Sequence, residues 1–240
     1  MATSGTYIYQ LSSDDLINAA YRKLLVIGES QTANAAKLVT GRQAQNVLVA
    51  GFRSLGMPLW ARKELAITLV SGQKNYTIGI GQTISQPYPV HIHEAVLNQG
   101  STDSNIDINM MARADFNLLP ETTGGTAVNA TYQPFINYGV LSVWPTPDSS
   151  MASGTTATIT YQAPFQYFIA GADTPDFPEE WYNAIIYGTA VLLAPENGTP
   201  LQDQQSLQKQ ADQYLSMALN NGTEDGSIFF GKDFAGSPQK

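Results

Sequence analysis

Hydrophobic residues recur with helical spacing at both ends of this chain of 240 residues, and they alternate with strand spacing in between. An apolar helix face needs a partner surface, so helices from the two ends are expected to pack on each other. The order predicts an α+β fold with a β unit inserted into a helical domain. The expected parts are a helical domain of residues 1–62 and 172–222, an antiparallel β domain of residues 63–171 folded as a sandwich or barrel, and an extended C-terminal arm of residues 223–240.

The segment from residue 173 to 198 carries the clearest helix signals. Asp176 and Glu179 have the spacing of a capping box, and Pro178 suits the first turn, where its missing N–H costs nothing. A glycine inside a helix costs about 1 kcal/mol relative to alanine, so we expect Gly188 to permit the close approach of another backbone. The core face predicted from the helical spacing consists of Trp181, Ile185, Gly188, Val191 and Leu192.

Further helices follow from similar signals. The first is expected to be capped by Ser12 or Ser13 and to end at Gly28. The last begins with a capping box at Thr199 and Gln202. Another runs from residue 33 to 55, and its predicted apolar face consists of Ala36, Val39, Val47, Leu48 and Leu55.

Alternating segments in the middle of the chain predict about six or seven short strands. The first two are expected to form one hairpin across a turn at residues 71–74, and the next two another. The predicted strands cover residues 65–69, 76–78, 90–97, 106–110, 130–135, 140–144 and 157–163, with one helical turn at residues 115–120.

The net charge of −8 is unevenly distributed. Residues 1–63 hold seven basic and three acidic residues, residues 64–171 two and seven, and residues 172–240 three and ten. One interpretation is chance variation on solvated surfaces. The other is that the basic end of one copy meets the acidic end of a neighbour, an arrangement that sets orientation more than affinity. On that hypothesis Arg42 and Arg53 lie in a contact between subunits.

The residues offer no constellation for catalysis. The chain has no cysteine, and a third metal ligand is missing beside His91 and His93, because Glu94 is expected on the other face of their strand. The acidic pairs at residues 14–15 and 179–180 lie where helix N-termini favour negative charge. We expect no enzymatic activity, no metal and no cofactor. No signal peptide and no apolar run of about 18 residues is found, so no membrane contact is expected.

Several motifs, taken in their order and spacing, resemble those of head-to-tail adaptor proteins of tailed bacteriophages, which are ring proteins under the portal related to tail tubular protein A. The resemblance extends from about residue 12 to residue 220. The sequence departs from the family pattern before Arg113, where a serine cap is expected. The matching motifs are Gly28-Glu-Ser30, Leu55-Gly-Met-Pro-Leu-Trp60, the segment Val70–Gly79, Leu141-Ser-Val-Trp144 with its following Pro-Thr-Pro-Asp148, Asp176-Phe-Pro-Glu-Glu-Trp181, Tyr187-Gly-Thr-Ala190 and Leu193-Ala-Pro-Glu-Asn-Gly198.

The resemblance implies a structural protein of the virion that is assembled in the host cytoplasm. It implies a closed ring of twelve copies between the portal protein and the tail nozzle or tail tube, with DNA passing through the ring without specific binding. An acidic channel wall would repel phosphate and let DNA slide.

The C-terminal arm contains apolar side chains at a spacing that is neither helical nor alternating. Buried aromatic anchors of this kind supply much of the binding energy of an interface. We expect the arm to reach a neighbouring subunit or the portal, although it could instead fold back on its own subunit. The expected anchors are Ile228, Phe229, Phe230 and Phe234.

Two other classes of protein remain open. A tail-fibre or receptor-binding module would also be rich in β structure and lack cysteine, but it would not need several well-capped long helices. A tail-associated hydrolase would need acidic residues clustered in a cleft.

Overall fold

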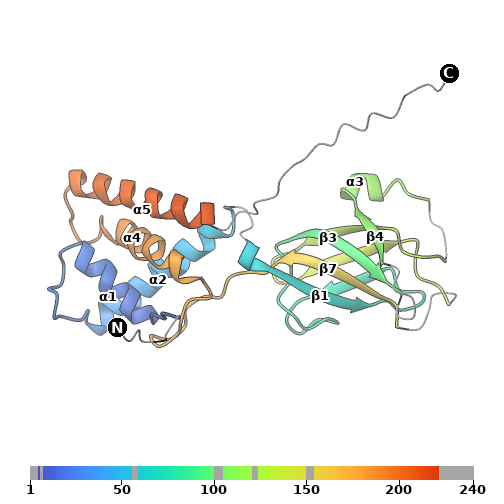
Figure 1. The fold of residues 1–240 in the computed structure, drawn as a ribbon, viewed down its shortest axis with the longest axis horizontal. Coiled ribbons are helices and arrows are strands. Elements are labelled where there is room, and N and C mark those ends of the chain that lie inside the picture. Colours follow the sequence, from blue (N-terminus) through green and yellow to red (C-terminus); the bar gives the residue numbers. More distant parts are fainter. Residues whose placement is uncertain are drawn as a thin grey trace, which may run out of the picture.

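The computed structural model describes Gly5 and residues 8–55, 59–99, 105–120, 124–149 and 154–221. Figure 1 shows two parts side by side, one helical and one built around a β-sheet. The helical part consists of α1 (Ser13–Lys23), α2 (Ala35–Phe52), α4 (Tyr182–Leu193) and α5 (Leu201–Asn221). The short 3-10 helices η1 (Leu59–Ala61) and η2 (Glu179–Trp181) directly precede β1 and α4.

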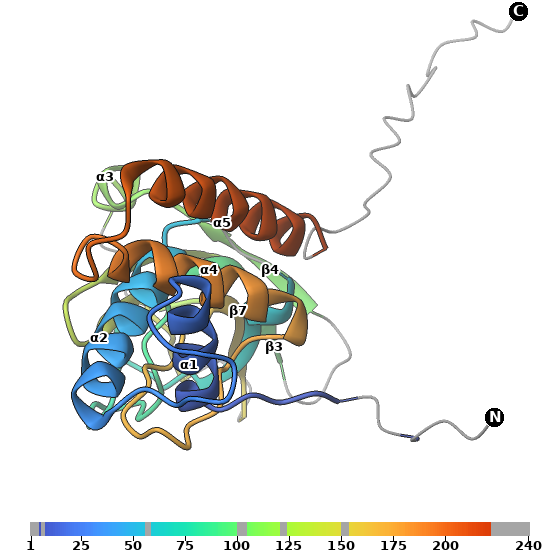
Figure 2. The same cartoon turned by 90° about the vertical axis from the view of Figure 1, so that its left-hand side faces the viewer.

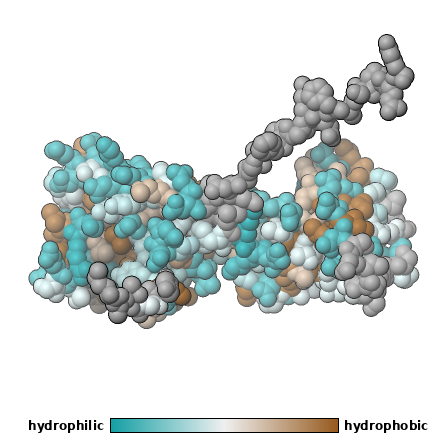
Figure 3. Space-filling model, viewed as in Figure 1, coloured by the Kyte–Doolittle hydropathy of each residue, from teal (hydrophilic) through white to brown (hydrophobic). Residues whose placement is uncertain are grey.

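The helices from both ends of the chain share one hydrophobic core. α4 lies in the middle of it and packs against α1, α2 and α5 (Figure 2). Completely buried residues include Leu16 and Ile17 of α1, Val49 of α2 and Ile185 of α4. The visible surface in Figure 3 is mixed on both parts, with hydrophobic residues in several small groups.

α1 begins with a capping box and ends earlier than predicted. The Ser12 hydroxyl accepts a hydrogen bond from the Asp15 backbone N–H at 3.2 Å, and the Asp15 carboxylate accepts one from the Ser12 N–H at 3.1 Å. The helix ends at Lys23 rather than at Gly28, because the chain turns at Leu25, whose φ of 57° is left-handed. The predicted start is confirmed and the predicted end is wrong.

α2 presents a different face to the core from the predicted one. Its buried residues are Gly41, Gln45, Val49 and Phe52, whereas Val39 is 53% and Val47 63% exposed. A Cβ atom at Gly41 would lie 2.5 Å from Cγ2 of Ile17, so the glycine permits the close approach of α1. The Gln45 side chain accepts a hydrogen bond from the Ser13 hydroxyl at 2.8 Å. Because the core face contains a glycine and a buried amide, the spacing of hydrophobic residues predicted the wrong face of α2.

The chain enters α4 without the predicted capping box. The 3-10 helix η2 precedes α4, its N-cap is Pro178, and no side chain makes a capping hydrogen bond there. Proline has no hydroxyl or carboxylate to offer, and the first turn is satisfied by a backbone bond from Trp181 N–H to the Pro178 carbonyl at 3.0 Å. At the start of α5, the Gln204 side-chain amide donates to the Thr199 carbonyl at 2.7 Å.

The β part is one curled sheet of seven strands in the order β1-β7-β3-β4-β5-β6-β2. Most neighbours are antiparallel, but β4 and β5 are parallel, so the sheet is mixed rather than antiparallel as predicted. The connection between these two strands contains the short helix α3 (Arg113–Phe116). The strands are β1 (Arg62–Thr68), β2 (Asn75–Ile78), β3 (His91–Asn98), β4 (Asn105–Met110), β5 (Asn129–Pro134), β6 (Gly139–Trp144) and β7 (Thr156–Gln162).

Of the two predicted hairpins, the second is confirmed and the first is wrong. β3 pairs with β4, but β1 pairs with β7 and β2 with β6, at opposite edges of the sheet. The short connection between β1 and β2 can span at most about 24 Å, whereas the outer strands of a flat seven-stranded sheet lie about 29 Å apart. The sheet therefore curls, and the connection is held by hydrogen bonds such as Gly72 N–H to the Pro147 carbonyl at 2.8 Å.

The inner face of the sheet holds a second hydrophobic core, separate from that of the helices. Two chain segments join the parts and run side by side, with Arg62 opposite Gln162 and a hydrogen bond of 3.2 Å from Ala163 N–H to the Ala61 carbonyl. Phe165 and Phe168 follow this crossing and are buried in the helical core. The core of the sheet contains, among others, Tyr76, Ile78, Leu97, Ile108, Leu141, Val143 and Ile159.

Candidate functional site

Trp181 of η2, the first of the predicted core residues, belongs to an aromatic cluster. Trp181 is 2% exposed, and its ring centroid lies 5.4 to 5.6 Å from those of Phe52, Trp60 and Phe177. The contacts with Phe52 and Trp60 are edge-on, a geometry that adds to the stabilisation that burial provides. Ile185, one turn further along, is completely buried.

The remaining predicted core residues of α4 differ in their surroundings. A Cβ atom at Gly188 would lie 2.7 Å from Cδ2 of Leu48, so the glycine makes room for a side chain of α2 rather than for a backbone. Val191 is partly buried against the core. Leu192 is 40% exposed, which corrects its expected place in the core. Neighbouring helix positions point about 100° apart, and Leu192 borders a shallow groove of about 210 Å³ between α2, α4 and α5.

The two arginines predicted for a subunit contact make contacts within the chain. Arg42 forms an ion pair with Asp14 of α1 at 2.7 Å, and its side chain is only 19% exposed. Arg53 donates to the Phe165 carbonyl at 3.2 Å, and its guanidinium lies 4.8 Å from the centre of the Tyr167 ring. Both arginines therefore hold elements of one subunit together. The four predicted anchors of the C-terminal arm, Ile228, Phe229, Phe230 and Phe234, lie outside the described residues.

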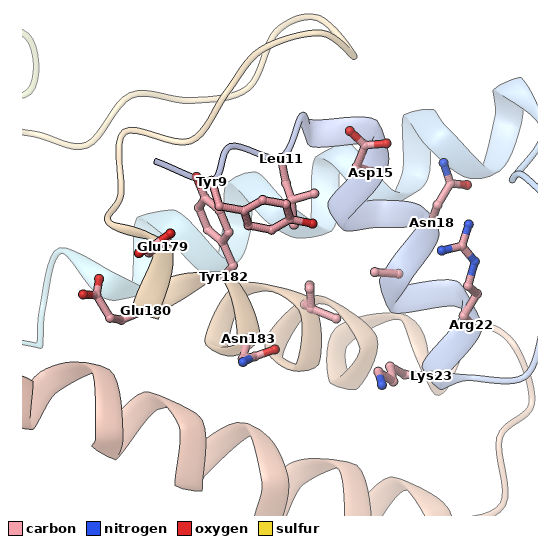
Figure 4. A pocket seen from close by; sticks show the side chains of 12 residues that line it. Tyr9, Leu11, Asp15, Asn18, Arg22, Lys23, Glu179, Glu180, Tyr182 and Asn183 are labelled. Carbon is pink, nitrogen blue, oxygen red and sulfur yellow. The ribbon is translucent and has the colours of Figure 1, made fainter. Parts of the chain in front are cut away.

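A groove of about 640 Å³ lies between α1 and the start of α4. Figure 4 shows its lining: Arg22 and Lys23 of α1 lie towards one end, and Glu179 and Glu180 of η2 towards the other. Tyr9 crosses the middle, with its ring centroid 6.4 Å from that of Tyr182. The groove is lined by Tyr9, Leu11, Asp15, Asn18, Ala19, Arg22, Lys23, Glu179, Glu180, Tyr182, Asn183 and Ile186.

Apolar groups form part of this groove and charged groups lie at its ends. Burial raises the pKa of Tyr182 above its ordinary value, with a smaller contribution from Glu179. The phenol therefore stays protonated at neutral pH and acts as a hydrogen-bonding group, not as a base. A mixed, open groove of this kind fits a protein surface better than a small substrate. The groove could not be predicted from the sequence, because its residues come from distant segments and share no spacing pattern.

The histidines do not form a metal site among the described residues, where no group of three potential ligands comes together. The register of β3 against β7 shifts between Ile92 and Glu94, so His93 occupies a bulge. This bulge places Glu94 on the same face as His91, in contrast to the prediction. Burial, and then the charge of Arg62, lower the pKa of His93. No helix in the described part is both long and apolar enough to cross a membrane.

Comparison with known proteins identifies one family. The model of the SU10 adaptor protein family matches residues 11–228. A solved structure described as the neck of an empty GTA particle, computed with C6 symmetry, is similar at 13% sequence identity and a TM-score of 0.30, over 80% of this chain and 84% of that chain. A search of curated protein sequences found no match. The family match confirms the resemblance to head-to-tail adaptors drawn from the sequence motifs, and it spans nearly the whole chain, which therefore belongs to the SU10 adaptor protein family.

Proposed function

We propose that this adaptor protein forms a closed ring of twelve copies between the portal protein and the tail nozzle or tail tube of a virion. The observation that carries the proposal is the match of residues 11–228 to an adaptor family. The proposed place of action is the mature particle, after assembly in the host cytoplasm. An adaptor works by assembly, so its function needs neither a catalytic group nor a cofactor nor a membrane.

The division into two cores supports a ring subunit with two specialised parts. We infer a helical domain of residues 1–62 and 172–222 and an inserted β domain of residues 63–171, with the refinement that Phe165 and Phe168 pack in the helical core. Closed rings are built from heterologous contacts, which need two different complementary surfaces on each subunit. A subunit with distinct parts can use one for ring closure and the other for the portal or tail.

The acidic character of the chain supports a channel through which DNA slides. The net charge is −8, and a wall of the same sign as phosphate disfavours binding. We expect the purified protein to leave duplex DNA unshifted in a mobility assay at low salt. Tight binding in that assay would contradict a passive channel.

The C-terminal arm of residues 223–240 is proposed to bind a neighbouring subunit or the portal through Ile228, Phe229, Phe230 and Phe234. Deleting residues 223–240 should leave the melting temperature of the monomer unchanged and abolish its attachment to portal-containing particles. Unfolding of the truncated protein, or normal attachment, would show that the arm is not a connector.

The decisive experiment is cryo-EM of purified particles and of particles disrupted to release their tails. The expected result is a ring of this protein directly beneath the portal, with twelve copies resolved by its symmetry. Density for this protein in fibres or at the distal tail end would contradict the proposal and favour a receptor-binding role. A ring with another copy number would correct only the stoichiometry.

A further inference from the structure

The solvent side of α2 carries an uncharged stripe along the whole helix. Its members are spaced by three or four residues, as one helix face requires, and all are exposed. Val39 is 53% exposed and Val47 is 63% exposed. The stripe, which we call the α2 outer stripe, consists of Ala36, Val39, Gln43, Val47 and Ala50.

A surface helix normally turns charged residues to solvent. α5 does so, with exposed Asp203, Lys209 and Asp212. The side chains of the three basic residues at α2 instead contact groups of their own subunit. The Lys37 ammonium lies 5.6 Å from the centre of the Tyr21 ring, Arg42 pairs with Asp14, and Arg53 lies over Tyr167. This arrangement keeps the outer stripe free of charge.

α2 lies at an edge of the helical part (Figure 2). Within the described structure its main helix contacts are with α1 and α4. One flank is fixed to the segment between β7 and η2 by Asn46, whose side chain both donates to the Phe168 carbonyl and accepts from the Phe168 N–H at 2.9 Å. The helix therefore has no charged residue among its buried core positions and none on its free side, a pattern typical of a helix that packs between two layers.

The groove between α1 and α4 lies on the side of the helical part that faces away from the α2 outer stripe. In Figure 4 the groove faces the viewer and α2 runs behind α1 and α4. Leu11, Ala19 and Ile186 supply apolar lining, matching an uncharged stripe. Head-to-tail contact in a ring requires two such different surfaces on opposite sides of one subunit.

Charged groups flank the apolar part of the groove. Arg22 and Lys23 lie towards one end, and Glu179 and Glu180 towards the other. Glu179 and Glu180 at the groove are exposed, and neither takes part in an ion pair with another described residue. Opposite charge around an apolar contact favours one orientation of the two partners.

We propose that the α2 outer stripe of one copy packs into the groove between α1 and α4 of the next copy. This inference rests on the ring named in the proposed function, and it identifies the surfaces that close the ring. Each subunit then offers its stripe to one neighbour and its groove to the other.

Because the chain contains no cysteine, the contact can be tested by cross-linking with introduced cysteines. Val47→Cys places a thiol on the stripe, and Asn183→Cys places one in the exposed part of the groove. In particles assembled with the double variant, a short bismaleimide should give a ladder of cross-linked oligomers. Each single variant should stay monomeric under the same treatment, since stripe meets groove and neither surface meets itself.

Other results would overturn the inference. The absence of a ladder from rings that contain the double variant would place the contact elsewhere. Dimers from Val47→Cys alone would show two stripes packed against each other about a two-fold axis. If the chain is missing from the ring beneath the portal, the proposed function itself fails, and this inference fails with it.

A charge substitution gives a second readout. Val39→Glu combined with Val47→Glu should lower ring formation at least tenfold, because two carboxylates would be buried in an apolar contact. Both side chains are more than half exposed in the subunit, so its melting temperature should stay the same. Met217→Glu is the matched control, since Met217 is 55% exposed on α5 outside both surfaces. Normal ring formation by the double variant would contradict the inference.

Discussion

Gly41 and Gly51 belong to the same helix but differ in their surroundings. A Cβ atom at Gly41 would lie 2.5 Å from Cγ2 of the buried, β-branched Ile17, whereas one at Gly51 would have no neighbour within 4 Å. Gly41→Ala should therefore lower the free energy of unfolding by about 1–3 kcal/mol, despite the better helix propensity of alanine. Gly51→Ala should raise it by roughly 0.5–1 kcal/mol.

Urea denaturation of both variants checks this pair of opposite shifts. Ile17 belongs to α1, so the Gly41 result reports on the distance between α1 and α2. If both variants were stabilised, α1 would have to lie further from α2 than in this structure.

Asp173 is expected to make stability depend on pH. Its carboxylate accepts hydrogen bonds from the N–H groups of Ala170 and Ile169 at 2.7 Å each, and these bonds lower its pKa. A lowered folded-state pKa stabilises the fold fully above the unfolded pKa of about 4, and this contribution is lost as pH falls through the folded pKa. The same segment holds α1, because the Ser13 N–H donates to the Asp173 carbonyl at 2.8 Å.

Asp173→Asn keeps an acceptor oxygen but cannot titrate. We expect the wild-type chain to be more stable than this variant at neutral pH, and the difference to shrink as the solution is acidified below about pH 4. Urea midpoints measured between acidic and neutral pH test the expectation. A difference that is the same at every pH would mean that the charge of Asp173 does not contribute.

At the scale of elements, helix starts can be compared between α1 and α4. Ser12 forms both hydrogen bonds of its capping box, whereas the segment before η2 forms no side-chain cap. Ser12→Ala should cost about 0.5–2 kcal/mol of stability. Asp176→Ala, at the position where the sequence also predicts a box, should change stability by less than about 0.5 kcal/mol. Equal losses of melting temperature in the two variants would show that Asp176 does act as a cap.

Element types were predictable from local periodicity, but their partners were not. The strands of the first predicted hairpin exist close to their expected positions, yet β1 and β2 lie at opposite edges of the sheet. A short turn between alternating segments is the signal of a hairpin, and it is also what a curled sheet needs to join its edges. Only long-range pairing with β7 and β6 distinguishes the two cases.

The proposed assembly surface on α2 shows the same limit. The spacing of Val39 and Val47 predicts a core face, although both side chains are exposed. The true core face uses Gly41 and Gln45, whose roles depend on Ile17 and Ser13 of another helix. A helix that is uncharged on two sides gives no local signal of which side packs within its own subunit.

At the scale of the whole molecule, two cores are connected by a pair of adjacent segments. Arg62 and Gln162 face each other at the start of β1 and the end of β7, and paired residues of antiparallel strands lie about 5 Å apart. A short glycine–serine linker can therefore join Ala61 to Pro164 without moving the helices. We expect the helical part without residues 62–163, and the excised β part alone, each to fold, because each keeps its own hydrophobic core.

The three tryptophans make the two products easy to follow. Trp60 and Trp181 stay in the aromatic cluster of the helical fragment, and Trp144 is the tryptophan of the β fragment. The helical fragment should show cooperative melting and the emission of buried tryptophan. If it is unfolded while the β fragment folds, the β domain must supply contacts that the helical core needs. In that case the two domains would unfold as one cooperative unit. The proposal that one domain closes the ring while the other binds the tail would then lose its structural basis.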